Sequence, residues 1–266
     1  MKYKIGFIGC GNMAQAIIGG LTGNAGIDKS LIIAADPNSN ALDKVSNERK
    51  IVTTTDNNEV ASNSEVIFLA VKPQYYETVI SGIKDKISSR QLIITIAPGK
   101  TLSWLAERLG SDRKIVRTMP NTPALVGAGI TGVCRNANVN DEDYSYALSL
   151  IGSFGLAEDV PESLMDCVVS VSGSSPAYVF MFIEAMADAA VADGMPRDKA
   201  YRFAAQAVMG SAKMVLDTGK HPAELKDMVC SPGGTTIEAV RVLEEKGMRS
   251  AVFEAMKACT KKAKGL

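Results

Sequence analysis

The sequence is poor in the residues that disulfide frameworks, metal sites and charge-driven binding require. Its five cysteines in 266 residues are an odd number without a CxxC pair, which argues against a zinc spacing and a disulfide framework. The single histidine, His221, precedes Pro222 at an expected helix start, a position that favours a structural role. Basic and acidic residues count 29 each, so no net charge would hold the chain on nucleic acid or anionic lipid. We therefore expect a small-molecule ligand and no nucleic-acid partner.

Long apolar runs are also missing. No uninterrupted apolar stretch reaches the roughly 18–20 residues that a membrane helix needs, and the run at Ala185–Ala192 is broken by Asp188. The first residues, MKYKIGFIG, predict a strand and no cleavable leader. Together with the lack of a disulfide framework, this predicts a cytoplasmic protein without a membrane partner.

The sequence does have a change of period near residue 160. Before it, short apolar runs bounded by turn residues alternate with helix-compatible stretches. This alternation predicts an α/β fold, a doubly wound parallel sheet of the Rossmann type. The expected strands are Lys4–Ile8, Leu31–Ala35, Val66–Ala70, Leu92–Ile96 and Ile115–Met119, with weaker ones at Gly129–Cys134 and Leu156–Asp159.

Beyond residue 160 the apolar spacing becomes helical, and alanine and methionine become frequent. Small apolar stripes let helices pack closely, often against another subunit. We therefore predict a dinucleotide-binding Rossmann domain over residues 1–160 and an all-helical substrate-binding and dimerisation domain over residues 161–266. The expected helices of the second domain are Pro176–Asp193, Arg197–Thr218, Thr236–Lys246 and Met248–Lys262.

The strongest local signal is the glycine-rich segment after the first expected strand. Residues 6–14 read GFIGCGNMA and contain G-x-G-x-x-A between a strand and a helix, the context that the dinucleotide fingerprint requires. Gly9 permits a tight turn, Gly11 lets a pyrophosphate approach the backbone, and Ala14 allows close helix–strand packing. The helix N-terminus then offers N–H groups and partial positive charge to the phosphates. A turn that serves only packing is the alternative.

Two further strand ends carry candidate cofactor residues. Asp36 ends the second strand, where an acidic residue bonds the ribose 2′-hydroxyl of NAD and repels the 2′-phosphate of NADP. Asp36 therefore favours NADH, unless it is only a turn residue before Pro37. The strand Val66–Ala70 continues into Lys72, which could meet a phosphate or ribose; a plain surface lysine is the alternative.

The helical half contains two Ser/Gly/Pro clusters, SGSSPAY at residues 172–178 and SPGGTT at residues 231–236. Each is expected to precede a helix and so to present several backbone N–H groups to an anion. A small carboxylate suits them, because the sheet half already provides for phosphates. Helix capping without a ligand is the alternative for both clusters.

The motifs GFIGCGNMA, FLAVKP, MPNTP, SGSSPAY, ADGMPRDKA and KDMVCSPGGTT follow one another from Gly6 to about Arg249. In order and spacing, this set resembles pyrroline-5-carboxylate reductase. The resemblance implies reduction of 1-pyrroline-5-carboxylate to L-proline, the last step of proline biosynthesis, with NADPH or NADH. It also implies a Rossmann domain followed by a helical domain that interlocks with its twin in a homodimer, and rings of such dimers.

The resemblance also implies roles for individual residues. Thr236 would lie near the imine nitrogen, as a hydrogen-bond partner and not as a strong acid. The dinucleotide residues would be Gly9, Cys10, Gly11, Asn12, Met13, Asn57, Ala70, Val71, Lys72 and Pro73. The substrate residues would be Glu162, Ser231, Gly233, Gly234, Thr235 and Thr236.

The chain departs from the family pattern at two positions. Ser175 stands where the family commonly has glycine, and Asp36 replaces a small hydroxyl residue of many NADPH-preferring members.

Two other functions stay open. A β-hydroxyacid-type dehydrogenase would need a lysine near the nicotinamide, for which Lys213 and Lys226 are available, although the SPGGTT loop argues against it. A regulatory protein would bind NAD(P) without turnover.

Overall fold

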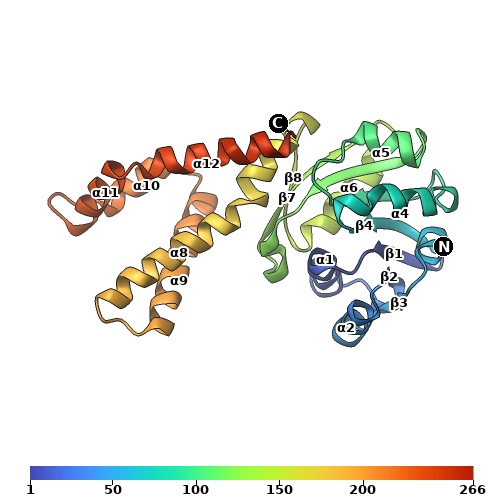
Figure 1. The fold of residues 1–266 in the computed structure, drawn as a ribbon, viewed down its shortest axis with the longest axis horizontal. Helices are drawn as coiled ribbons and strands as arrows, with labels where there is room; N and C mark the ends of the chain where they lie inside the picture. The colour runs from blue at the N-terminus through green and yellow to red at the C-terminus, as the bar shows by residue number, and fades with distance from the viewer. Residues whose placement is uncertain (266) are drawn as a thin grey trace. The chain divides into compact units, whose positions relative to one another are not determined.

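The computed structural model describes residues 1–265 as two compact units (Figure 1). The sheet unit comprises residues 1–174 and the C-terminal residues from 260 onward, and the helical unit comprises residues 175–259. The division at residue 160 stays a prediction; the structure groups residues 161–174 with the sheet.

Eight strands of the described chain form one sheet in the order β3-β2-β1-β4-β5-β6-β7-β8. Neighbouring strands are parallel except for β6 and β7, which run antiparallel. The predicted doubly wound fold is confirmed, and every expected strand is present. β3 was not expected, because this short strand at the sheet edge has no apolar run. The bounds are β1 (Tyr3–Ile8), β2 (Ile32–Ala35), β3 (Val52–Thr54), β4 (Ser64–Leu69), β5 (Leu92–Thr95), β6 (Lys114–Met119), β7 (Gly129–Arg135) and β8 (Gly155–Asp159).

Helices cover both faces of the sheet, because successive strand residues point to opposite faces. Phe7 belongs to one buried apolar cluster and Ile8 to the other. The first cluster packs under α1 (Asn12–Gly23), α2 (Ser39–Arg49) and α6 (Asp141–Gly152). The second packs under α3 (Asn57–Asn63), α4 (Tyr76–Ile83) and α5 (Leu102–Leu109). Both faces are therefore dry, as a parallel sheet requires.

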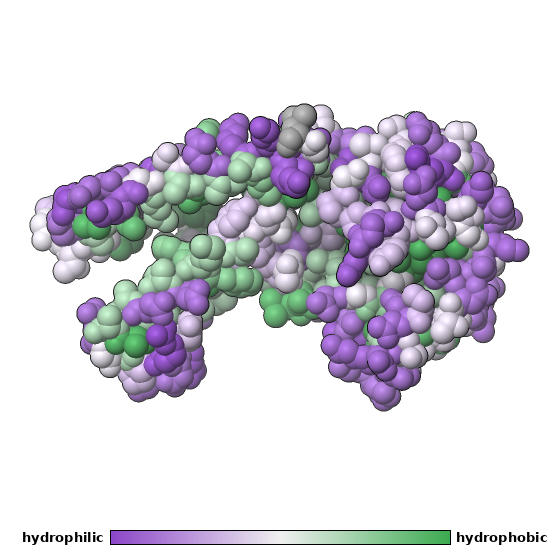
Figure 2. Space-filling model, viewed as in Figure 1, coloured by the Kyte–Doolittle hydropathy of each residue, from purple (hydrophilic) through white to green (hydrophobic). Residues whose placement is uncertain are grey.

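The helical unit has almost no interior of its own. Its buried residues are three alanines, Ala187, Ala200 and Ala204. Large apolar side chains are instead exposed: Phe180 by 60% and Phe203 by 66%. Apolar surface gathers along α8 in Figure 2. The unit consists of α8 (Ser175–Ala192), α9 (Arg197–Thr218), α10 (Pro222–Val229), α11 (Thr235–Glu245) and most of α12 (Met248–Ala263).

The stretch Glu162–Ala192 is continuously helical, through α7 (Met165–Val168), a π-helical turn (Val169–Gly173) and α8. Its length and composition would suit a membrane span, and 11% of its most apolar window is buried within the described residues. Helices that pack against other protein meet the same criterion, so the criterion by itself does not choose between lipid and protein. His221 caps α10, where its Nδ1 accepts the Ala223 N–H at 3.2 Å, which agrees with the structural role expected for it.

The exposed apolar side chains of the helical unit indicate an interaction surface, since monomeric soluble proteins rarely expose large contiguous apolar patches, and we expect another protein chain to cover it. We predict that Phe180→Glu lowers the assembly state of the chain, measured by light scattering after gel filtration. The wild-type melting temperature should rise with protein concentration, as mass action requires. Lys44→Glu, on the outer face of α2, is the matched control. A Phe180→Glu variant with wild-type mass would contradict this interpretation.

Candidate active site

The candidate cofactor site lies at the carboxyl edge of the sheet. β1 has β2 on one side and β4 on the other, so the strand order reverses between β1 and β4. Open α/β sheets bind ligands at such a switch point. The predicted cofactor residues follow the ends of β1, β2, β3 and β4, which all lie at this edge of the sheet.

The glycine-rich loop is held by a very close backbone approach. Gly9 has a φ of +104°, and a Cβ at this position would lie 2.6 Å from the Ala70 carbonyl oxygen and 3.0 Å from the Val71 nitrogen. Two backbone bonds of 2.8 Å hold the loops in register, from Gly9 N–H to the Ala35 carbonyl and from Ala70 N–H to the Ile8 carbonyl. Only glycine meets both the backbone and the space requirement.

Gly11 has a different environment, which fits a ligand. A Cβ at Gly11 would meet no atom within 4 Å, so the space above this residue is open. Gly11 is also the N-cap of α1 and supplies no side-chain cap, so the first N–H groups of that helix stay available. Asn12 is exposed and Met13 half-buried at the start of α1. An open glycine beside an uncapped helix N-terminus fits a pyrophosphate.

The carboxylate of Asp36 is part of this loop. Its Oδ2 accepts the Cys10 N–H and its Oδ1 accepts the Asn38 N–H, both at 2.9 Å. Burial, and secondarily the charge of Asp36, raise the pKa of the Cys10 thiol to about 12. Cys10 therefore acts through its backbone and not as a nucleophile.

The remaining predicted cofactor residues lie on neighbouring loops. Lys72 is exposed and caps the short 3-10 turn that starts at Pro73. Asn57 is half-buried at the start of α3. Below Lys72, the buried Tyr76 hydroxyl donates to the Leu69 carbonyl at 2.6 Å and fixes the end of β4. Burial raises the pKa of Tyr76, so this hydroxyl stays a donor.

Glu162, predicted as a substrate residue, lies in the sheet unit and joins two of its elements. Its Oε1 accepts the Leu102 N–H at 2.7 Å and the Arg117 Nη1 at 2.8 Å. Arg117 lies on β6 and is only 5% exposed, so its charge is buried in the sheet unit. Arg117 was not predicted as a functional residue, although a charge inside the largely apolar run of β6 was an available signal. A role of Glu162 at the substrate stays a prediction.

The cluster SGSSPAY does contain the expected helix start, because α8 begins at Ser175, but the expected free N–H groups are not found there. Residues 169–173 form a π-helical turn in the middle of a longer helix, and the Ser174 N–H donates to the Val169 carbonyl at 2.8 Å. The helix already runs through this cluster, so its N–H groups are not presented to an anion. Pro176 is the second residue of α8, as the preference of proline for the first turn of a helix predicts, and the π turn precedes it directly.

The second cluster does form a helix start, in the helical unit. The Gly234 N–H donates to the Ser231 carbonyl at 3.0 Å, and Gly233 has a φ of +68°. Proline followed by a positive-φ glycine is the pattern of a type II turn. A Cβ at Gly234 would lie 2.4 Å from the Ser231 hydroxyl oxygen, which explains the second glycine. Gly234 is the N-cap of α11 and offers no side-chain cap, so the first N–H groups, including those of Thr235 and Thr236, lack a side-chain partner there.

Comparisons with known proteins support the expected family for both the N-terminal and the C-terminal half of the chain. Residues 162–266 match the family described as pyrroline-5-carboxylate reductase dimerisation, and residues 4–99 match the family described as NADP oxidoreductase, coenzyme F420-dependent. The chain is 56% identical to pyrroline-5-carboxylate reductase of Escherichia coli K12 over 266 residues, covering 100% of this chain and 99% of the relative. The chain belongs to the pyrroline-5-carboxylate reductase family. It is therefore an NAD(P)H-dependent oxidoreductase with a dimerisation domain.

Solved structures give the same result. The pyrroline carboxylate reductase of Plasmodium falciparum, solved with NADP bound, superposes with a TM-score of 0.90 at 34% identity and covers 100% of this chain and 98% of that one. The enzyme from Coxiella burnetii superposes with a TM-score of 0.91 at 36% identity, with the same coverage. The expected family, fold and nicotinamide cofactor are thus confirmed, while the roles of single residues stay predictions.

The position of Asp36 leads to a prediction about cofactor choice. Replacing it by asparagine removes a negative charge beside the expected 2′-position, so the ratio of kcat/KM for NADPH to that for NADH should rise about tenfold. Asp43→Asn, an exposed position on α2, makes the same charge change away from the loop and serves as the control. An unchanged ratio, or an equal shift in the control, would show that Asp36 does not select the cofactor.

The contacts of Glu162 lead to a prediction about stability. Glu162→Ala should lower the free energy of unfolding by about 2–4 kcal/mol, because it leaves a buried guanidinium and a helix N–H without their acceptor. Urea denaturation measures the loss. Glu158→Ala, on the exposed part of β8, is the control and should cost well under 1 kcal/mol. Equal losses of unfolding free energy in the two variants would show that the Arg117–Glu162 pair does not stabilise the fold.

Proposed function

We propose that the chain reduces 1-pyrroline-5-carboxylate to L-proline, the last step of proline biosynthesis, with NADPH or NADH as the hydride source. One observation carries this proposal. The chain has two helix starts without a side-chain cap. One is at Gly11, at the carboxyl edge of the sheet, with open space beside the glycine, and the other follows the turn at Ser231–Gly234. A phosphate-bearing cofactor and a small carboxylate each have a site of suitable chemistry.

The turn before α11 is the proposed carboxylate site. Backbone N–H groups at the start of a helix bind anions, and the helix dipole adds partial positive charge. Charge-assisted bonds of this kind contribute about 1.5–3 kcal/mol each, so two or three would fix the small ring. Ser231, Gly233, Gly234 and Thr235 are the residues proposed to surround the carboxylate. Glu162 is proposed as a further substrate residue, as the family resemblance implies.

The chemistry asks little acid–base work of the protein. A protonated cyclic imine is already a good electrophile at its C=N carbon. That carbon would take its hydride from a bound reduced nicotinamide, and the electron pair of the C=N π bond would move to the nitrogen. The Thr236 hydroxyl is proposed to hydrogen-bond the nitrogen and to relay a proton from water. Orientation and electrostatics then supply most of the rate enhancement.

The two alternatives differ from this proposal in what they would require. A β-hydroxyacid-type dehydrogenase would use Lys213 or Lys226 on the substrate hydroxyl. In the helical unit Lys213 pairs with Asp217, and Lys226 pairs with Asp227 at 2.6 Å. A regulatory protein would bind the cofactor without consuming it. Neither alternative accounts for the complete turn before α11.

We also propose an assembly and a location. The apolar surfaces of the helical unit are covered by a second copy of the chain and not by lipid, and dimers join into a ring. The protein works in the cytoplasm and binds neither nucleic acid nor membrane. The balanced charge and the lack of a disulfide framework support this.

The direct test is absorbance at the reduced-nicotinamide band, with pyrroline-5-carboxylate and either NADPH or NADH. The proposal predicts loss of absorbance matched by proline formation. A parallel reaction offers hydroxy acids with the oxidised cofactors. Turnover only in that reaction favours the dehydrogenase, and cofactor binding without turnover favours the regulatory protein.

The role of Thr236 is tested by substitution. Thr236→Ala should lower kcat about tenfold or more, while the dissociation constant for the cofactor stays within about twofold, because only the hydrogen bond to the imine is lost. Thr236→Ser should restore most of kcat, since it restores the hydroxyl. Thr218→Ala, at the exposed end of α9, is the control. Wild-type turnover of Thr236→Ala would remove this residue from the mechanism.

A further inference from the structure

The π-helical turn Val169–Gly173 lies at the carboxyl edge of the sheet. A Cβ at Gly173 would come within 2.8 Å of the Met119 terminal methyl, and Met119 is the last residue of β6. Val168, just before the turn, packs against Gly132 of β7. π-bulges inside α-helices occur frequently at functional sites. This turn therefore belongs to the same edge as the cofactor loops.

One side chain fixes the turn to the sheet. Asn121 follows the end of β6 and is only 8% exposed. Its Nδ2 donates to the Ser172 carbonyl at 3.1 Å, and its Oδ1 accepts the Ile130 N–H, at the start of β7, at 2.9 Å. Both ends of the carboxamide are thus used, one by the sheet and one by the π turn.

The sequence leaves the Ser172 carbonyl without its usual α-helical donor. In an α-helix the Ser172 carbonyl would accept the N–H of residue 176, but that residue is proline and has no N–H. The Asn121 amide supplies a donor to this carbonyl instead. An aspartate at position 121 would keep the acceptor for Ile130 and lose the donor for Ser172.

We propose that Asn121 is a positioning residue for the reaction. Its carboxamide holds the π turn, and with it Ser172–Ser174, at a fixed place on the carboxyl edge of the sheet, where the nicotinamide end of the cofactor reacts. This inference rests on the proposed reduction. It assigns Asn121 no contact with the substrate; the residue acts through the turn that it anchors.

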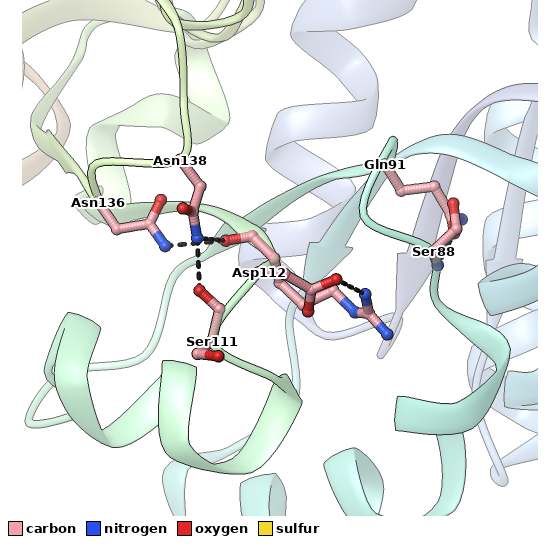
Figure 3. A network of polar contacts seen from close by, with 7 residues as sticks. Ser88, Gln91, Ser111, Asp112, Asn136 and Asn138 are labelled. Atoms are coloured by element: carbon pink, nitrogen blue, oxygen red, sulfur yellow. Dashed lines mark hydrogen bonds and ion pairs between the residues drawn. The ribbon is translucent and has the colours of Figure 1, made fainter.

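The test compares N121D with N136D. Asn136 is a matched control, because its Oδ1 accepts the Ile115 N–H at 3.1 Å and its Nδ2 donates to the Arg113 carbonyl at 2.8 Å. It therefore makes the same two kinds of bond, but at the amino end of β6. Figure 3 shows Asn136 beside Asn138 in this network, which includes the turn at Ser111.

N121D should lower kcat about tenfold to hundredfold, because a small displacement near the reacting atoms is costly. The KM for the cofactor should change less than about threefold, since the phosphates bind at the glycine-rich loop. N136D should keep the wild-type kcat even where both variants lose similar stability in urea. Asn121→Ala removes the bond to the Ser172 carbonyl without adding a charge, so it should also lower kcat, and it keeps the test open if N121D folds poorly.

A pH profile separates positioning from a purely structural loss. The new carboxyl group would face a carbonyl in a buried place, which raises its pKa above the ordinary 3.9 or so. When protonated, it can donate to Ser172 again. The ratio of kcat in N121D to wild-type kcat should therefore rise as the pH falls from about 8 to about 6.

Three results would overturn the inference. If the wild-type protein reduces pyrroline-5-carboxylate and N121D does so with the same kcat, Asn121 does not position the reaction. An equal fall of kcat in N136D would show a general loss of stability instead. A wild-type protein that does not reduce pyrroline-5-carboxylate would overturn the proposed reaction, and this inference with it.

Discussion

The contact of Gly9 with the end of β4 is the constraint on which the candidate cofactor site depends. The two backbones can approach so closely only because residue 9 has no side chain and takes a positive φ. With the loop held there, α1 begins at Gly11 with its N–H groups open, and the Cys10 N–H meets the Asp36 carboxylate from β2. Three loops that are distant in sequence thus form one edge, and every proposed role for NADPH or NADH relies on that edge.

The helical unit is organised by the opposite condition, an interior that is missing. Three alanines are its buried residues, and its phenylalanines and most of its methionines are exposed. A chain that belongs to a family with a dimerisation domain completes this interior with a second copy. The turn Ser231–Gly234, proposed to hold the substrate carboxylate, lies in this same unit. Assembly and substrate binding are therefore expected to be coupled, since the turn is only as firm as the helices around it.

Local patterns predicted most of the fold and the outline of the site. The apolar runs gave the strands, and the motif GFIGCGNMA gave the loop at Gly9, because strands and tight turns depend on neighbouring residues. Features that depend on distant residues were missed. Neither the Arg117–Glu162 pair nor the Asn121–Ser172 bond can be read from spacing, since their partners lie 45 and 51 residues apart. The π turn before α8 was not predicted either, because Pro176 indicates the first turn of a helix and says nothing of a helical stretch that precedes it.

The central claim is that a nicotinamide bound at this edge gives its hydride to the imine carbon of pyrroline-5-carboxylate. The most direct measurement uses a cofactor deuterated at the transferred position and follows the product by NMR. The account predicts proline with one deuterium on its δ carbon for each cofactor oxidised. Proline without deuterium at that carbon, or oxidation of the cofactor without proline, would contradict it.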